Sequence, residues 1–297
     1  MTDNNLPVKH RKFSLNIRKT KKKGVLVLSV GAVTLLVLFA VLLHGVASLK
    51  VTEYNITADS LPTSFNGFRI AQVSDLHNAR FGKNNSRLIE RLKKALPDII
   101  VITGDLVDSS HTDINTATDF VRRAVEIAPV YYVSGNHEAW LNESDYLTLK
   151  ECLAASGAVL LENQSVDIFH GDEHITLAGV DDPDMCGDNE FFSALDTLSA
   201  EKKAYTVLLS HRPEYFEHYM ECGFSLVLSG HTHAGQIRLP FIGAVVAPGQ
   251  GLFPEYDKGL FKEDGAVMIV SAGLGNSVIP FRLFNTPEIV VTVLNGT

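Results

Sequence analysis

The chain has 297 residues, 45% of them hydrophobic, which is ordinary for a globular protein. Its charge is uneven: residues 1–23 hold eight basic residues and one acidic residue, which leaves 18 basic and 33 acidic residues, a balance of −15, in the rest of the chain. Long-range repulsion opposes nonspecific binding of nucleic acid by so acidic a body, and we expect no stable nucleic acid partner.

The N-terminal region predicts a membrane anchor. Residues 1–23 read as a basic cytoplasmic tail, and 24–47 form an apolar run without Asp, Glu, Lys or Arg, long enough to span a bilayer as a helix. The positive-inside rule places the tail in the cytoplasm and residues 51–297 outside, so we expect a single-pass protein of the cell membrane with an extracytoplasmic domain. Two alternatives are a cleaved signal peptide, because Gly45 and Ala47 put small residues at the −3 and −1 positions of a cleavage site, and a buried soluble helix.

The first half of the domain predicts alternating strands and helices. Residues 51–66 read as a connector that begins with an edge strand. Strands are expected at 69–74, 98–103 and 130–134, and helices with apolar residues at helical spacing at 86–96, 112–127 and 147–155. The β-branched run 98–103 predicts a strand buried on both faces. This alternation predicts a mainly parallel sheet with right-handed crossovers.

The second half predicts shorter strands. They are expected at 159–161, 165–169, 174–178, 205–209, 224–228, 237–239, 267–270 and 288–294, with a helix over 189–198. Gly171-Asp172 marks a hairpin turn, and 243–251 reads as a loop. No Pro/Gly/Ser linker divides 51–297. We therefore predict one α/β domain in which two sheets pack together.

Polar side chains follow five of the predicted strands, at the edge where α/β sheets bind ligands. In an extended segment residues two apart point the same way, so two such pairs can each face one metal ion. Taken singly, each of these residues has an ordinary structural role, as a turn cap or a hydrogen-bonded histidine. The side chains, in chain order, are Asp75 and His77; Asp105 and Asp108; Asn136 and His137; His211; and His231 and His233.

The residue types predict a metal centre. Imidazole, carboxylate and amide ligands without thiolate suit manganese, iron or zinc, and the three cysteines lack C-x-x-C spacing and read as unpaired thiols. Seven ligands are too many for one ion but fit two, and the two oxygens of the central Asp105 make it the natural bridge. Two metals about 3.5–4 Å apart can activate a water and clamp a phosphoryl group. The predicted ligands are Asp75, His77, Asp105, Asn136, His211, His231 and His233.

In these blocks the sequence resembles the calcineurin-like metallophosphoesterases. The family pattern D-x-H, G-D-x-x-D, G-N-H-[DE], H and G-H-x-H appears in order within residues 68 to 275. The N-terminal span, residues 74–78 and residues 230–236 look like the membrane-anchored bacterial branch of the family. The resemblance implies a four-layer αββα sandwich of two mixed β-sheets, the metallo-dependent phosphatase fold, here preceded by one transmembrane helix.

The resemblance also implies roles. One metal would be held by Asp75, His77 and His233, the other by Asn136, His211 and His231, with Asp105 bridging the two divalent ions (Mn²⁺, Fe²⁺/Fe³⁺ or Zn²⁺). His137 would be the catalytic general acid, and Asp108 would orient it. Asn78 and Arg80, just past the first motif, are candidate substrate contacts, with a solvated surface arginine as the alternative for Arg80.

The sequence therefore predicts a membrane-anchored hydrolase of phosphate esters that works by in-line attack of metal-bound hydroxide. By resemblance phosphodiesters are favoured over monoesters. Lipid head groups or cell-wall polymers are plausible substrates because the anchor keeps the site at the envelope, and nucleotide diesters stay open. The alternative is a non-catalytic envelope protein that uses the fold as a metal-binding platform, which would be expected to lack His137 or a bridging ligand. A secreted enzyme is a second alternative.

Overall fold

The computed structural model describes residues 29, 31, 48–202, 205–239, 241–263, 265–276 and 281–297. The chain divides into two compact units, Met1–His44 and Gly45–Thr297. In the first unit only Ser29 and Gly31 are described, and both are helical. The predicted tail and the rest of the predicted anchor at 24–47 lie outside the described residues. Among the residues that are described, no helix is long and apolar enough to cross a membrane.

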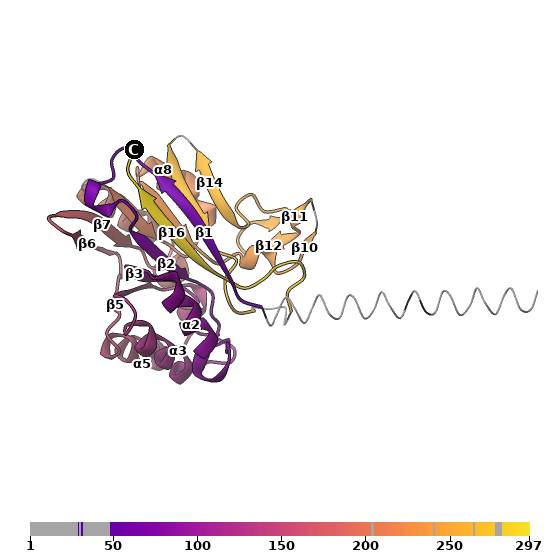
Figure 1. The fold of residues 1–297 in the computed structure, drawn as a ribbon. Helices are drawn as coiled ribbons and strands as arrows, with labels where there is room; N and C mark the ends of the chain where they lie inside the picture. The colour runs from indigo at the N-terminus through magenta and orange to yellow at the C-terminus, as the bar shows by residue number, and fades with distance from the viewer. Residues whose placement is uncertain are drawn as a thin grey trace, which may run out of the picture. The chain divides into compact units, whose positions relative to one another are not determined.

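The first sheet, sheet A, has the strand order β1-β16-β2-β3-β4-β5 (Figure 1). β1 lies at its edge and runs parallel to β16, β16 is antiparallel to β2, and β2 to β5 run parallel. The expected edge strand and parallel βαβ pairing are thus confirmed. The strand bounds are β1 Lys50–Thr57, β2 Arg69–Val73, β3 Ile99–Thr103, β4 Val130–Val133, β5 Val159–Leu160 and β16 Glu288–Asn295.

The second sheet, sheet B, has the order β14-β15-β9-β8-β7-β6. Its central strands β15, β9, β8 and β7 run parallel, and both edge strands are antiparallel. β6 and β7 form a hairpin across the turn expected at Gly171-Asp172. The strand bounds are β6 Gln164–His170, β7 Glu173–Gly179, β8 Thr206–Leu209, β9 Leu226–Ser229, β14 Gly259–Glu263 and β15 Ala266–Val270. The prediction of an α/β fold with two mixed sheets is confirmed.

Helices flank each sheet. The α-helices are α2 Ser86–Ala95, α3 Ile114–Ala124, α4 Asn136–Ala139, α5 Glu143–Ala155, α6 Pro183–Cys186, α7 Asp188–Glu201 and α8 Phe216–Glu221. Short 3₁₀ turns lie at Thr63–Phe65, Lys83–Asn85, Pro213–Tyr215 and His233–Gly235. α2, α3 and α5 pack on one face of sheet A, and α7 and α8 pack on one face of sheet B. The remaining two sheet faces form a common core between the sheets.

Strand β3 shows how the sequence dictates this layering. Ile100 and Ile102 point into the core beneath the helices, whereas Ile99 and Val101 point into the core between the sheets. All five residues of β3 are buried, as the unbroken β-branched run predicts. Because apolar surface surrounds it on both sides, β3 is held firmly, and the loop that follows it starts from a fixed point.

Two stretches differ from expectation. The strand expected at 237–239 is not part of either large sheet, because Arg238–Leu239 (β10) pairs with Gly243–Ala244 (β11) in a small ribbon. The expected loop 243–251 contains strand residues, since Val246–Ala247 (β12) pairs with Gly251–Leu252 (β13). Glycine turns allow such two-residue pairings, which are too short to show a period in the sequence. The edge strand β14 and helix α8 were not expected either.

Candidate metal centre

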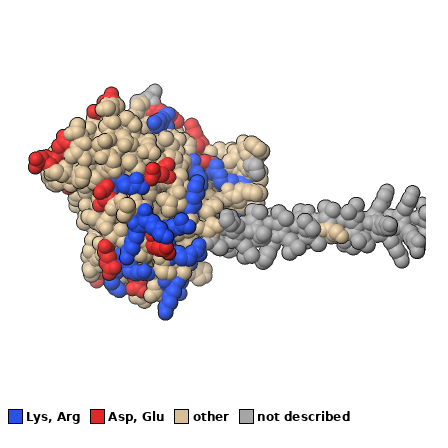
Figure 2. Space-filling view, in the orientation of Figure 1, with Lys and Arg blue, Asp and Glu red and all other residues tan. Residues whose placement is uncertain are grey.

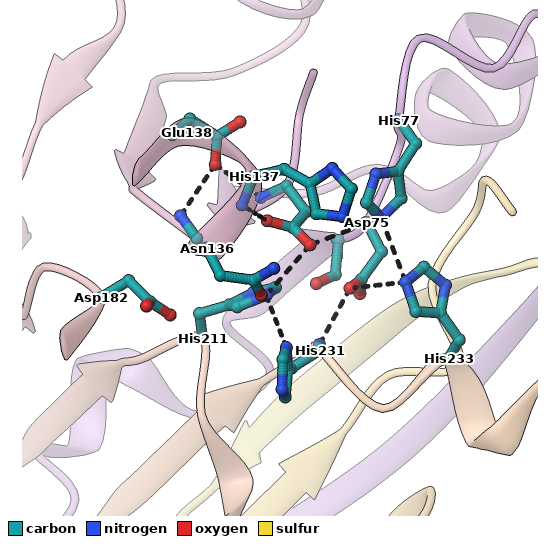
Figure 3. A network of polar contacts seen from close by, with 12 residues as sticks. Asp75, His77, Asn136, His137, Glu138, Asp182, His211, His231 and His233 are labelled. Carbon is teal, nitrogen blue, oxygen red and sulfur yellow. Dashed lines mark hydrogen bonds and ion pairs between the residues drawn. The ribbon is translucent and has the colours of Figure 1, made fainter. Parts of the chain in front are cut away.

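The ends of strands from both sheets meet at one site (Figure 3). β2, β3 and β4 of sheet A lead into the first four predicted ligands, and β8 and β9 of sheet B lead into the other three. Each of the seven side chains is at most 7% exposed, so burial is a common property of the site. The structure brings together all seven residues: Asp75, His77, Asp105, Asn136, His211, His231 and His233.

The backbone at these residues is unusual. Five of the seven have a positive φ in the left-handed region: Asp75, His77, Asp105, His231 and His233. The argument that each D-x-H or H-x-H pair points one way because it is extended is therefore wrong. The chain instead coils tightly at each strand end and turns the side chains inward. Left-handed backbone is unfavourable for residues other than glycine, and its concentration at a site marks strain kept for function.

Glycines let the strand ends approach one another. A Cβ on Gly104 would lie 2.5 Å from His211 Nδ1, and the φ of Gly104 is +81°. A Cβ on Gly135 would lie 2.4 Å from Asp105 Oδ1. Only glycine fits either place, so contact between neighbouring loops explains the glycines before Asp105 and Asn136.

The first half of the centre consists of Asp75, His77, Asp105 and His233. His77 Nε2 and His233 Nε2 are 3.0 Å apart. Asp105 Oδ2 is 3.4 Å from His77 Nε2, and Asp75 Oδ1 is 3.5 Å from His233 Nε2. The His231 amide also donates to Asp75 Oδ1, at 2.9 Å, which ties this half to the second.

The second half consists of Asp105, Asn136, His211 and His231. His211 Nε2 lies 3.1 Å from Asn136 Oδ1, 3.3 Å from Asp105 Oδ2 and 3.2 Å from His231 Nδ1. His211 Nδ1 lies 2.8 Å from the Thr103 carbonyl oxygen, to which it donates. That bond leaves the Nε2 lone pair facing the other ligand atoms, the usual way a protein orients a metal-binding histidine.

These atoms fit divalent cations. In both halves lone pairs of nitrogen and oxygen converge, and such atoms repel unless a cation or proton lies between them. Asp75 Oδ2 and His77 Nδ1 are buried without a hydrogen-bond partner among the described residues. Asp105 belongs to both halves, and each half forms a group of side chains whose ligand atoms could share one ion. The site is thus a candidate dinuclear centre with mixed nitrogen and oxygen ligands.

Burial and the charge of Asp105 set the pKa values in the site, and burial holds the pKa of His231 and of His233 well below the usual value. Burial alone would lower the pKa of His211, but the Asp105 carboxylate outweighs burial and raises it to about 10. Burial lowers the pKa of His77 to about 4, and it raises that of Asp75 to about 6. Burial would also raise the pKa of Asp105, yet His211 and His77 hold it well below its usual range. Asp105 is therefore the anionic centre of the site.

Glu138 is a residue of the site that sequence reasoning left without a role. Its Oε2 accepts hydrogen bonds from the amides of Asp105 and Gly135, both at 2.8 Å, and its Oε1 accepts one from Val107 at 3.1 Å. The buried carboxyl thus joins the loop after β3 to the loop after β4. Burial, reinforced by Asp105, raises the pKa of Glu138 to about 8. Its position in the Gly135–Glu138 motif is the feature of the sequence that could have identified Glu138.

His137 lies at the rim of the centre, with its ring edge-on to His77 at 4.4 Å between centroids. Its Nδ1 accepts the Ser109 amide at 3.1 Å and lies 3.2 Å from Ser109 Oγ. Asp108 Oδ1 is 4.0 Å from the same nitrogen and accepts hydrogen bonds from the Ser110 amide and hydroxyl. Because an amide can only donate, neutral His137 carries its proton on Nε2.

Two arginines near the centre were not predicted. Arg282 is fully buried, donates to the Ala272 carbonyl oxygen at 2.7 Å and approaches His233 Nδ1 at 3.5 Å. Arg212 holds Asp182 through two parallel hydrogen bonds of 2.7 and 2.8 Å and lies 3.3 Å from His231 Nε2. The signal for Arg212 was its position directly after His211. Arg282, a lone charge between Phe281 and Leu283, carried little signal.

The candidate substrate contacts lie outside the group of ligands. Asn78 donates to the His111 carbonyl oxygen, and its Oδ1 is buried without a hydrogen-bond partner among the described residues. Arg80 is largely exposed, pairs with Asp113 at 2.7 Å and lines a polar cleft of about 450 Å³. The ion pair of Arg80 fits the alternative of a solvated surface arginine. Its exposed side chain is also accessible to a substrate.

The fold and the site together define an α/β protein with a candidate dinuclear metal centre at the strand ends. A family model described as calcineurin-like phosphoesterase matches residues 68–235. The chain belongs to the calcineurin-like phosphoesterase family, and it is a hydrolase of phosphoric esters. The family expected from the motifs is thereby confirmed.

Relatives align over most of the domain. The chain is 30% identical to "Uncharacterized metallophosphoesterase YkuE" of Bacillus subtilis over 84% of this chain and 86% of that protein. It is 30% identical to an "Uncharacterized metallophosphoesterase" of Aquifex aeolicus over 84% of this chain and 92% of that protein. It is 29% identical to a "Transmembrane protein with metallophosphoesterase domain" of Danio rerio, over 82% of this chain but 57% of that protein.

Proposed function

We propose that the chain is a membrane-anchored phosphodiesterase with a dinuclear centre bridged by Asp105. The observation that carries the proposal is the position of Asp105 Oδ2, 3.4 Å from a histidine of the first half and 3.3 Å from a histidine of the second. The first ion would be held by Asp75, His77 and His233, and the second by Asn136, His211 and His231. Manganese, iron and zinc all suit this ligand set.

Two bound divalent cations would supply an activated water and positive charge beside the phosphate oxygens. The chain's own residues do the rest. In its imidazolium form, His137, which is 8% exposed, can donate a ring proton to the leaving oxygen as a general acid and return to the neutral ring. Ser109 orients the ring, and the Asp108 carboxylate stabilises the imidazolium by charge. Glu138 fixes the loops that carry Asp105 and Asn136.

The membrane topology, the domain bounds and the substrate class are proposed from the sequence. We propose a cytoplasmic tail at 1–23, an anchor at 24–47 and an extracytoplasmic catalytic domain at 51–297 arranged as a four-layer αββα sandwich. The apolar run supports the anchor, as does the name of the Danio rerio relative, a transmembrane protein. Phosphodiesters of the envelope, in lipid head groups or cell-wall polymers, are the proposed substrates, and Asn78 and Arg80 are proposed substrate contacts.

A non-catalytic platform is less well supported. Such a protein needs the ligands but not a proton donor, whereas here His137, Ser109 and Asp108 are all kept beside the centre.

The test uses the full-length chain in detergent, stripped of metal and then supplied with Mn²⁺, Zn²⁺, Fe²⁺ or Mg²⁺. Hydrolysis of bis-(p-nitrophenyl) phosphate is compared with that of p-nitrophenyl phosphate. We expect metal-restored turnover, faster on the diester, that collapses in His137→Ala but persists in His218→Ala, a matched histidine on α8. Two bound metals without turnover of either ester would favour the platform.

A further inference from the structure

A group of exposed apolar side chains, here called the apolar rim, lies beside the metal centre. Phe241 is fully exposed, and Leu252 and Phe253 are 71% and 67% exposed. In a soluble protein, scattered exposed apolar residues are normal, but a contiguous group marks an interaction site. The rim consists of Leu239, Phe241, Ile242, Leu252, Phe253 and Phe284.

Backbone contacts join the rim into one surface. Arg238, at the start of β10, donates to the Leu283 carbonyl oxygen at 3.0 Å, which brings the segment of Phe284 beside β10. Phe253 donates to Val245 at 2.9 Å, which brings the β12–β13 turn to the same place. The rim is therefore built from three loop segments that converge, and its side chains protrude from turns.

The rim is attached to the metal centre at two points. Asn285, next to Phe284, donates to the His233 carbonyl oxygen at 2.7 Å. Asp257 accepts Arg238 at 2.8 Å and, through its carbonyl oxygen, the hydroxyl of Thr232, which lies between His231 and His233. A partner bound at the rim would thus lie next to the first half of the centre.

The charge of the rim differs from that of the rest of the domain. Segments 236–254 and 276–287 contain no acidic residue, and their two basic residues, Arg238 and Arg282, are ion-paired or fully buried. In Figure 2 the surface over β10, β11 and β12 is mainly tan. A neutral, apolar surface on a body with a balance of −15 suits the hydrocarbon boundary of a bilayer better than a charged protein partner.

The rim also holds strained backbone. Phe241, Phe253 and Phe284 all have a positive φ. This conformation is unfavourable for a bulky residue and persists where function requires it. Here it directs three large rings away from the domain rather than into its core.

The chain enters the domain close to the rim. The Lys50 amide donates to the Pro287 carbonyl oxygen at 2.9 Å. Ser48 is two residues before Lys50, and Phe284 is three residues before Pro287, so Ser48 and Phe284 lie within about 25 Å of each other at full extension. The apolar run 24–47 is joined directly to Ser48. An anchor in that run would therefore hold the rim within reach of the bilayer surface.

We propose that the apolar rim inserts into the bilayer surface and that the centre acts on phosphate esters carried by membrane lipids. This inference rests on the proposed anchor and phosphoesterase activity. Insertion of aromatic side chains would fix the centre at head-group depth, where an ester in the membrane can reach the metals without leaving the bilayer.

The first test places a tryptophan in the rim of the full-length chain. Trp140, the single native tryptophan, is replaced by Phe, and Phe253→Trp or Phe241→Trp is added. The control is Phe169→Trp, 68% exposed on β6, which Figure 1 shows at the opposite end of the unit from β10 to β12. In phosphatidylcholine vesicles with brominated acyl chains we expect blue-shifted, quenched emission from the rim variants and neither change in the control. Rim emission quenched no more than the control, or a chain that does not associate with vesicles, would overturn the docking surface.

The second test separates docking from catalysis. Two reporters share one chemistry: soluble bis-(p-nitrophenyl) phosphate, and p-nitrophenyl hexadecyl phosphate embedded in phosphatidylcholine vesicles. In Phe241→Ser/Phe253→Ser we expect hydrolysis of the embedded ester to fall about tenfold or more, since two apolar anchors are lost, while the soluble rate stays unchanged. Loss of neither rate, or equal loss of both, would overturn the lipid-substrate proposal, as would a wild-type chain that hydrolyses the soluble ester alone. If the wild type hydrolyses neither ester, the phosphodiesterase proposal fails, and the quenching result still decides the docking surface.

Discussion

The two halves of the metal centre use similar side chains but differ in charge. The first half has its own carboxylate, Asp75, beside the shared Asp105, whereas the second half has the neutral amide of Asn136. Arg282 opposes the charge of the first half, but it lies beyond the His233 ring and acts from farther away. A carboxylate in direct contact outweighs a more distant cation. We therefore expect the first half to bind its ion more tightly, so the centre fills in order.

Removing the shared ligand should break both halves at once. In Asp105→Asn the central carboxylate charge is lost, and we expect the loss of both ions and a fall in kcat of more than about 100-fold, since even outer partners of metal ligands are worth about 10–100-fold. Metal content is measured by emission spectrometry beside hydrolysis of bis-(p-nitrophenyl) phosphate. The exposed Asp119→Asn serves as the control. Retention of two ions per chain would show that Asp105 is not the bridge.

Removing the proton donor should leave both halves intact. In His137→Ala we expect kcat to fall by about 10²–10⁴-fold while metal content stays at two per chain. The loss should be smaller for a p-nitrophenyl leaving group than for an alkyl one, because a good leaving group needs less protonation. Equal losses for both leaving groups would argue that His137 positions the phosphate rather than donating a proton.

Exchanging charge between the halves should change their order of affinity. Asp75→Asn should weaken one of the two ions by about 10–100-fold, and Asn136→Asp should tighten the other. Competitive Mn²⁺ titration of the full-length chain measures both constants. If Asn136→Asp leaves the weaker constant unchanged, ligand charge does not explain the difference between the halves.

The smallest expected effect is a change in the free energy of unfolding caused by the carboxyl group of Asp181. Burial raises the pKa of Asp181 to about 6, above its ordinary value of 3.8. The folded state thus binds more protons than the unfolded state between these values, so this carboxyl lowers stability as pH rises through that window and has no effect below it. Asp181→Asn should raise the free energy of unfolding by about 3 kcal/mol at pH 7 and by little at pH 3.5. Urea unfolding at both pH values, with the exposed Asp59→Asn as control, measures this, and an equal gain at both would contradict the pKa account.

The sequence predicted which side chains meet at the strand ends better than it predicted the backbone that holds them. Strand β3 was predictable because a short, unbroken run of β-branched residues is typical of a buried strand. The meeting of the polar residues was predictable because parallel strands bring their carboxyl ends to one edge of a sheet. The left-handed backbone at Asp75 and His231 could not be predicted from the sequence, because contacts with neighbouring loops stabilise it. Glu138 and Arg282 were missed for a related reason: their roles depend on which amides and carbonyl groups surround them in the folded chain.

The loops were the hardest part of the fold to predict. β10 to β13 are each two residues long, so no hydrophobic period exists to be found. The edge strand β14 alternates partly buried and exposed residues in only five positions. Such segments take their conformation from glycine turns and from packing against the metal-site loops, as Gly235 against Ala244 illustrates.

Electron paramagnetic resonance of the Mn²⁺-loaded full-length chain tests the central claim most directly. If Asp105 bridges the two halves, two Mn²⁺ ions per chain should give the broad spectrum of an exchange-coupled pair, and Asp105→Asn should abolish that coupling. Two uncoupled six-line spectra, or binding of a single ion that supports full activity, would contradict a bridged dinuclear centre.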